Sequence, residues 1–108
     1  MSGWVVGGPA VADDGEIREV AGAALVRAGG RWFAVDDECS HADCPFSVDG
    51  EVDGTTLICN CHGSEFDLES GAVLLGPADR PLRRRAVRVR AGVVEVETGG
   101  DGPPGPRP

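Results

Sequence analysis

All four cysteines and both histidines of this 108-residue chain lie between residues 39 and 62. A chain of this length fits one small domain, and small domains often bury too little apolar surface to be stable without metals or disulfides. Aromatic residues make up only 5% of the chain, which also contains 17 Gly and 8 Pro, so we expect many loops and a thin core. The segment rich in cysteine and histidine is therefore expected to be a cross-linking site on which the fold depends.

Short runs of β-forming residues separated by turn residues recur along the chain, and no segment shows a sustained helical period. Residues 23–27 and 31–35 flank a glycine-rich turn and predict one hairpin. Further short strands are expected at residues 55–59, 65–67 and 72–75. The pattern predicts an all-β fold.

Residues 86–90 and 93–97 flank Ala91-Gly92 and predict a second hairpin with a two-residue turn. This turn fixes the register of the two strands, with valines on the core face and an Arg-Glu pair on the solvent face. The expected cross-strand pairs are Val89 with Val94, Val87 with Val96, and Arg88 with Glu95.

The predicted domain organisation is a single domain over residues 1–98, with a metal-binding insert at about 37–80. Residues 99–108 contain four prolines and no large apolar residue, so we expect a disordered tail. The chain has no long apolar run of the kind that spans a membrane or directs secretion, which predicts a cytoplasmic protein without membrane insertion.

Charge is distributed unevenly along the chain. The formal net charge of -8 argues against nucleic-acid binding, which requires a basic face. Residues 36–79 contain eleven Asp and Glu and no Lys or Arg, whereas six Arg crowd into residues 80–90. The metal-binding insert is therefore an acidic pole, and the arginine run is most simply a solvated strand edge.

The spacing of four residues indicates the kind of metal. Cys39 and His41 form a C-x-H pair, and Cys59 and His62 form a C-x-x-H pair seventeen residues after the first. Each loop thus offers one thiolate and one imidazole, the ligand set of a 2Fe-2S cluster in which two histidines replace two cysteines. A tetrahedral zinc site is the alternative, although zinc ligands usually come as pairs of two cysteines or two histidines.

Three segments carry a resemblance to a known family. CSHADC (39–44) and CNCHGSEFD (59–67) resemble the two cluster boxes of the Rieske family, and GPADRPL (76–82) resembles its proline-containing loop. The resemblance spans about residues 20–97. It implies an antiparallel β sandwich, the Rieske fold, with a small cluster-binding subdomain whose histidines face solvent where a redox partner docks.

The resemblance also implies roles for individual residues. Cys39 and Cys59 would bind the buried iron of one 2Fe-2S cluster, and His41 and His62 the outer iron. Cluster binding would bring Cys44 and Cys61 together, and a bridge between them is typical of respiratory, higher-potential members of the family. Two reduced, packed thiols are the alternative that a cytoplasmic location favours.

Two residues that follow His62 in the second box, Ser64 and Phe66, bear on the reduction potential. The Ser64 hydroxyl can donate to a cluster sulfur and stabilise the reduced state, which raises the potential. High-potential members of the family often carry a Tyr two residues later, where this chain has Phe66, which has no hydroxyl. We therefore expect an intermediate potential.

These features predict an electron carrier without a catalytic site of its own. The leading hypothesis is a Rieske ferredoxin that passes electrons from a flavin-dependent reductase to an oxygenase. The alternative is a subunit or excised domain of a larger redox complex, such as a cytochrome bc-type assembly or a small oxidoreductase subunit. A Rieske oxygenase is excluded, because its mononuclear iron site would need two further histidines.

Overall fold

The computed structural model describes residues 3–38, 44–78 and 80–97, which form three antiparallel sheets and one short helix. We call them the terminal, central and insert sheets. The terminal sheet has the order β1 (Trp4–Pro9), β11 (Val93–Glu97), β10 (Val87–Arg90). The central sheet has the order β2 (Ile17–Val20), β3 (Ala23–Ala28), β4 (Arg31–Asp36), β9 (Arg84–Arg85). The insert sheet has the order β5 (Gly50–Asp53), β6 (Thr56–Cys59), β7 (Ser64–Asp67), β8 (Val73–Leu75), with helix α1 (Phe46–Asp49) just before it.

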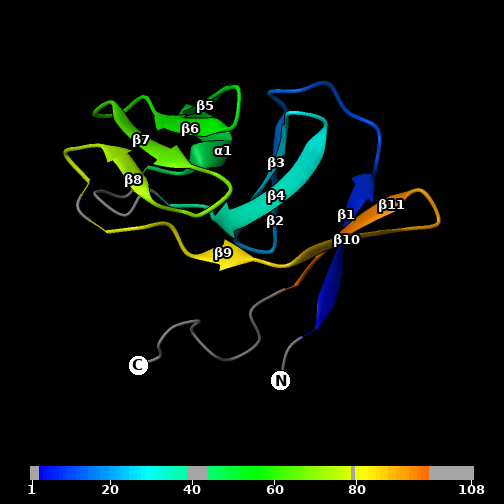
Figure 1. Ribbon diagram of the computed structural model, residues 1–108. Coiled ribbons are helices and arrows are strands. Elements are labelled where there is room, and N and C mark those ends of the chain that lie inside the picture. The colour runs from blue at the N-terminus through cyan, green and yellow to red at the C-terminus, as the bar shows by residue number, and fades with distance from the viewer. Residues whose placement is uncertain (1–2, 39–43, 79, 98–108) are drawn as a thin grey trace.

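The central sheet lies between the other two and is buried on both faces (Figure 1). Successive side chains of a strand point to opposite faces, so neighbours in β3 belong to different cores. Leu25 packs with Val94 of the terminal sheet, whereas Val26 packs with Leu57 of the insert sheet. This double burial explains why β3 is apolar almost throughout, and it confirms the predicted all-β antiparallel sandwich.

The insert sheet rests on the central sheet through a compact aromatic and aliphatic core. Phe46 of α1 and Phe66 of β7 are both fully buried, with ring centroids 5.8 Å apart and planes at 89°. Such edge-to-face pairs add stability beyond the area they bury. The strands that carry the second cluster box therefore stand on a fixed apolar base.

The terminal hairpin has the predicted register, since Val87 pairs with Val96, Arg88 with Glu95 and Val89 with Val94. The turn residues Ala91 and Gly92 have positive φ values of 53° and 77°, as a type I′ hairpin turn requires. The prediction that all four valines share the core is wrong for one of them. Val94 and Val96 are buried, but Val89 is 52% exposed because β10 is the edge strand of its sheet.

The other predicted strands are present with boundaries shifted by a residue or so. The first hairpin is β3 and β4, and the three short strands of the insert are β6, β7 and β8. The sequence analysis missed β1, β2, β5, β9 and the single turn of α1. The tail at 99–108 lies outside the described residues, and the limits of the single domain and of its insert stay predictions.

No helix in the described part of the chain has the length and apolar character needed to cross a membrane.

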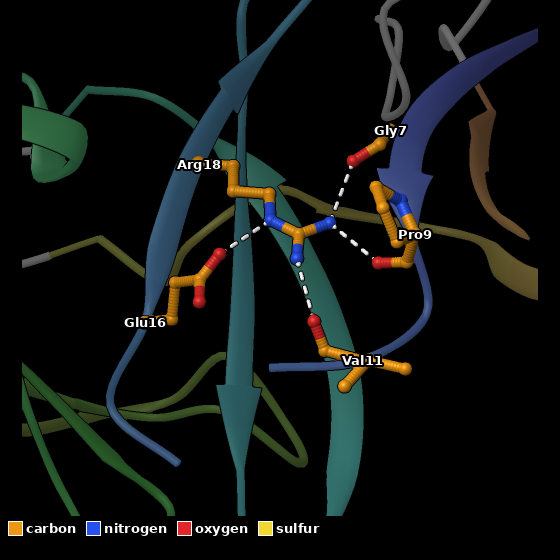
Figure 2. Close-up of polar contacts among 5 residues, drawn as sticks. All are labelled: Gly7, Pro9, Val11, Glu16 and Arg18. Atoms are coloured by element: carbon orange, nitrogen blue, oxygen red, sulfur yellow. Dashed lines mark hydrogen bonds and ion pairs between the residues drawn. The ribbon is translucent and has the colours of Figure 1, made fainter. Parts of the chain in front are cut away.

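One arginine ties the N-terminal strand to the central sheet (Figure 2). Arg18 of β2 donates from Nη1 to the carbonyl oxygens of Gly7 and Pro9, each at 2.8 Å, and from Nη2 to that of Val11 at 3.1 Å. Its Nε donates to the carboxylate of Glu16 at 2.5 Å. The guanidinium thus binds two carbonyl oxygens of the edge strand β1 and one just after it, a use of several donors that suits the planar fork of arginine better than lysine.

We expect Arg18→Ala to lower the free energy of unfolding by about 1.5 to 3 kcal/mol, the usual range for hydrogen bonds to a charged group. The guanidinium also stacks on Trp32 at 4.9 Å, so packing is lost along with the hydrogen bonds. Chemical denaturation measures the change. Arg90→Ala, at an exposed arginine on an edge strand, is the control and should stay within about 0.5 kcal/mol of wild type. Equal effects of the two substitutions would contradict the role given to Arg18.

Candidate metal centre

The second cluster box forms the β6–β7 hairpin. Cys59 ends β6 and pairs across the hairpin with Ser64, which begins β7. The Gly63 amide donates to the Cys59 carbonyl at 2.7 Å, and Gly63 has a φ of 82°, which a side chain would disfavour. Cys59 and Ser64 are 1% and 0% exposed, whereas His62 in the turn is exposed. The hairpin therefore presents a thiol inward and an imidazole outward.

A disulfide joins this turn to the segment before α1. Cys44 and Cys61 are bonded, with a Cα–Cα distance of 6.5 Å and a separation of 17 residues. The Asn60 amide also donates to the Asp49 carbonyl at 2.9 Å, so the end of α1 lies against the same turn. The structure thus contains the pairing that the family resemblance implies.

The segment with Cys39 and His41 lies outside the described residues, but both its ends are fixed. On the N-terminal side, the Asp37 carboxylate accepts a hydrogen bond from the Ser47 amide at 2.8 Å and another from the Ser47 hydroxyl. On the C-terminal side, Cys44 is held by its disulfide to the hairpin turn. The described residues on either side of the first cluster box are therefore held in place, Asp37 by α1 and Cys44 by the turn of the second box.

The proline-containing loop is attached to Ser64. The Ala78 amide donates to Ser64 Oγ at 3.0 Å, and both residues are buried. Ser64 is the buried polar side chain among the described residues. Because its oxygen accepts from Ala78, the hydroxyl hydrogen remains available for a second partner.

The sulfur atoms of Cys44, Cys59 and Cys61 all lie within 4.8 Å of one another. Two of them form the disulfide, which leaves Cys59 as the thiol that can bind a metal. Thiolate and imidazole are the donors of both zinc and Rieske-type iron sites, so the described half of the donor set fits either group.

Residues 8–90 match the Rieske [2Fe-2S] domain family. The match covers more than half of the chain, and the chain belongs to this family.

One sequence relative and one similar structure come from dioxygenase systems. The ferredoxin component of the p-cumate 2,3-dioxygenase system of Pseudomonas putida is 37% identical over 76 residues, which cover 70% of this chain and 64% of that protein. The chain thus matches slightly less than two thirds of this relative's length. A structure of the complex of reduced oxygenase and oxidised ferredoxin in carbazole 1,9a-dioxygenase contains a chain with a TM-score of 0.78 and 30% identity, covering 88% of this chain and 93% of that one.

A second similar structure is that of a plasma membrane Rieske protein. The plasma membrane Rieske protein PetC3 from the cyanobacterium Synechocystis PCC 6803 matches with a TM-score of 0.53 and 31% identity, covering 68% of this chain and 74% of that one. The match to the carbazole dioxygenase complex has the higher TM-score and covers more of both chains.

Several residues that position the site escaped the sequence analysis. Ser47 of α1 donates to Asp37, Ala78 donates to the Ser64 hydroxyl oxygen, and Asp49 lies beside the disulfide, with its Oδ2 3.6 Å from Cys61 Sγ. Each works through a tertiary contact. Only the proximity of these residues to the two boxes in the sequence could have pointed to them.

We expect a Cys44→Ser/Cys61→Ser double variant to lose about 3 kcal/mol of stability, the loop-closure value for a bridge across roughly this many residues. Thermal unfolding of the cluster-loaded protein, followed by loss of visible absorbance, measures the effect. Reduction with dithiothreitol provides the control, because it should lower wild type to the level of the variant and leave the variant unchanged. A variant as stable as the oxidised wild type would show that the disulfide contributes nothing.

Proposed function

We propose that this chain is a Rieske ferredoxin that carries single electrons to an oxygenase. The observation that carries the proposal is the β6–β7 hairpin, which presents buried Cys59 and exposed His62 from one turn in a chain of the Rieske family. The ferredoxin relatives from dioxygenase systems support the same function.

The proposed ligands of one 2Fe-2S cluster are Cys39, His41, Cys59 and His62. When bound, the cluster would supply one-electron redox chemistry at a potential above that of all-cysteine clusters. The chain itself places the Cys59 sulfur in the apolar core of the insert, away from water, and the His62 ring at the surface. A buried anionic ligand and an exposed neutral one suit a centre that must be protected and yet lie close to a partner.

The proposed partners are a flavin-dependent reductase and an oxygenase. Carboxylates near the His62 turn are at least partly exposed, among them Asp49, Glu51 and Glu65, so a basic surface on either partner would be attracted to this end. No catalytic site is proposed, and a cytoplasmic location stays a prediction from the sequence.

A second candidate function is membership of a larger redox complex. The Cys44–Cys61 disulfide favours it, since the resemblance associates this bridge with respiratory members of the family. The more complete structural match to the dioxygenase complex favours the ferredoxin. Reduction of a purified oxygenase component by the isolated chain would decide for the ferredoxin.

We expect His62→Ala to abolish the cluster and Asn60→Ala, in the same turn, to retain it. Asn60 is exposed, and its side chain reaches only outward to Glu51 at 3.2 Å. Iron and sulfide analysis and the reduced-state EPR signal are the measurements. Wild type should contain two irons per chain, as a 2Fe-2S cluster requires, and accept one electron. A colourless wild-type protein with stoichiometric zinc would refute the proposal.

We expect Ser64→Ala to lower the reduction potential, because it removes the hydroxyl hydrogen that can stabilise the reduced state. One hydrogen bond contributes about 0.5 to 1.5 kcal/mol, which corresponds to roughly 20 to 60 mV for one electron. Protein-film voltammetry measures the shift. Ser70→Ala is the control, since Ser70 is exposed and donates to Asp67 at 3.0 Å, at the end of β7 away from Ser64. Equal potentials for wild type and Ser64→Ala would show that the Ser64 hydroxyl does not stabilise the reduced cluster.

A further inference from the structure

The disulfide and the buried thiol of the metal centre are neighbours. The Sγ atoms of Cys44, Cys59 and Cys61 lie within 4.8 Å of one another, and only Cys44 and Cys61 are bonded. A thiol this close to a disulfide is placed for thiol–disulfide exchange, in which the attacking sulfur forms a new bond and one of the old sulfurs leaves.

The surroundings decide which sulfur would leave. Asp49 Oδ2 lies 3.6 Å from Cys61 Sγ, and Cys61 is exposed. In the exchanged isomer a Cys61 thiol could donate its S–H to this carboxylate and contact water, and both interactions stabilise that isomer. Attack on Cys61 would instead join Cys59 and Cys61, two residues apart, in a very short loop whose closure is strained.

We propose that Cys59 of the cluster-free protein attacks Cys44 and exchanges the Cys44–Cys61 disulfide for a Cys44–Cys59 disulfide. The Cys59–H and Cys44–Cys61 bonds break, and the Cys44–Cys59 and Cys61–H bonds form. The proton lost by Cys59 is balanced by the one that Cys61 gains. The number of disulfides is unchanged, so the step needs no oxidant or reductant.

The exchange would control whether the metal centre can take up its cluster. It rests on the proposed function, because it assumes that Cys59 is a cluster ligand. A Cys59 sulfur bound in a disulfide cannot ligate iron, so only the Cys44–Cys61 isomer is competent to take up the cluster. Bound iron would in turn hold Cys59 and preserve that isomer.

The test uses the full chain with Cys39→Ser, which leaves three cysteines and hence one thiol per disulfide-bonded molecule. The folded protein is incubated without metal under anaerobic conditions, quenched in acid, and alkylated, and the labelled and disulfide-linked peptides are identified by mass spectrometry. The proposal expects label on Cys61 together with a Cys44–Cys59 peptide. Label on Cys59 alone, with Cys44–Cys61 as the only linked peptide, would overturn it.

A matched pair of variants tests the direction of exchange in the same background. Asp49→Asn should lower the ratio of Cys61 label to Cys59 label by roughly tenfold or more, the order of effect of one hydrogen bond to a charged acceptor. Glu51→Gln removes a nearby carboxylate that bonds Asn60 instead and should leave the ratio unchanged. Equal ratios for the two variants would overturn the route through Cys61. Guanidinium-unfolded samples give the ratio of a chain without structure, and a folded protein with that same ratio would also count against the proposal.

The wild-type protein separates this inference from the proposed function. Disulfide mapping before and after chelation of the iron should show the Cys44–Cys59 peptide only afterwards. A wild-type chain that loads a cluster and carries an electron, yet never exchanges its disulfide, would keep the proposed function and lose this inference. A chain that exchanges its disulfide but binds no iron would keep the exchange step and lose the proposed function.

Discussion

The covalent bond between Cys44 and Cys61 is the constraint on which the metal centre depends. The core beneath the insert includes Cys59, whereas the turn that follows it, residues 60–63, is exposed and adds no buried apolar side chain. Closing a loop of about this length in the unfolded chain is worth roughly 3 kcal/mol in the entropic account, comparable to burying a large side chain. With that bond made, the contact of Asn60 with Asp49 and the contact of Ser47 with Asp37 need only fix local orientation.

Much of the fold could be predicted because its hairpins are local. The turn at Ala91-Gly92 determines which residues of β10 and β11 face one another, and the Arg88–Glu95 ion pair at 2.5 Å reports the same register. The first strand could not be predicted in this way. β1 pairs with β11 at the other end of the chain, and the Arg18 contacts that hold it join residues that no local pattern connects.

For the metal centre, too, local features could be predicted from the sequence and long-range contacts could not. The spacing of the two boxes predicted the ligand types, and the order of residues after the second box predicted a role for the Ser64 hydroxyl. What the sequence could not show is that Ser64 already accepts a hydrogen bond from Ala78, because residues 64 and 78 meet only through the fold of the proline-containing loop. This contact orients the hydroxyl, so the proline-containing loop takes part in positioning the side chains of the site.

The inward and outward placement of the ligands follows from the strand itself. Side chains alternate along β6, so Leu57 and Cys59 share the buried face, and the turn that follows exposes Cys61 and His62. Phe66, the fully buried partner of Phe46, fills the space beneath and offers no hydroxyl. Ser64 is then the buried side chain of the described hairpin that can donate a hydrogen bond inward. The disulfide holds the turn that presents His62, and we expect the Ser64 hydroxyl to raise the potential of a cluster bound there.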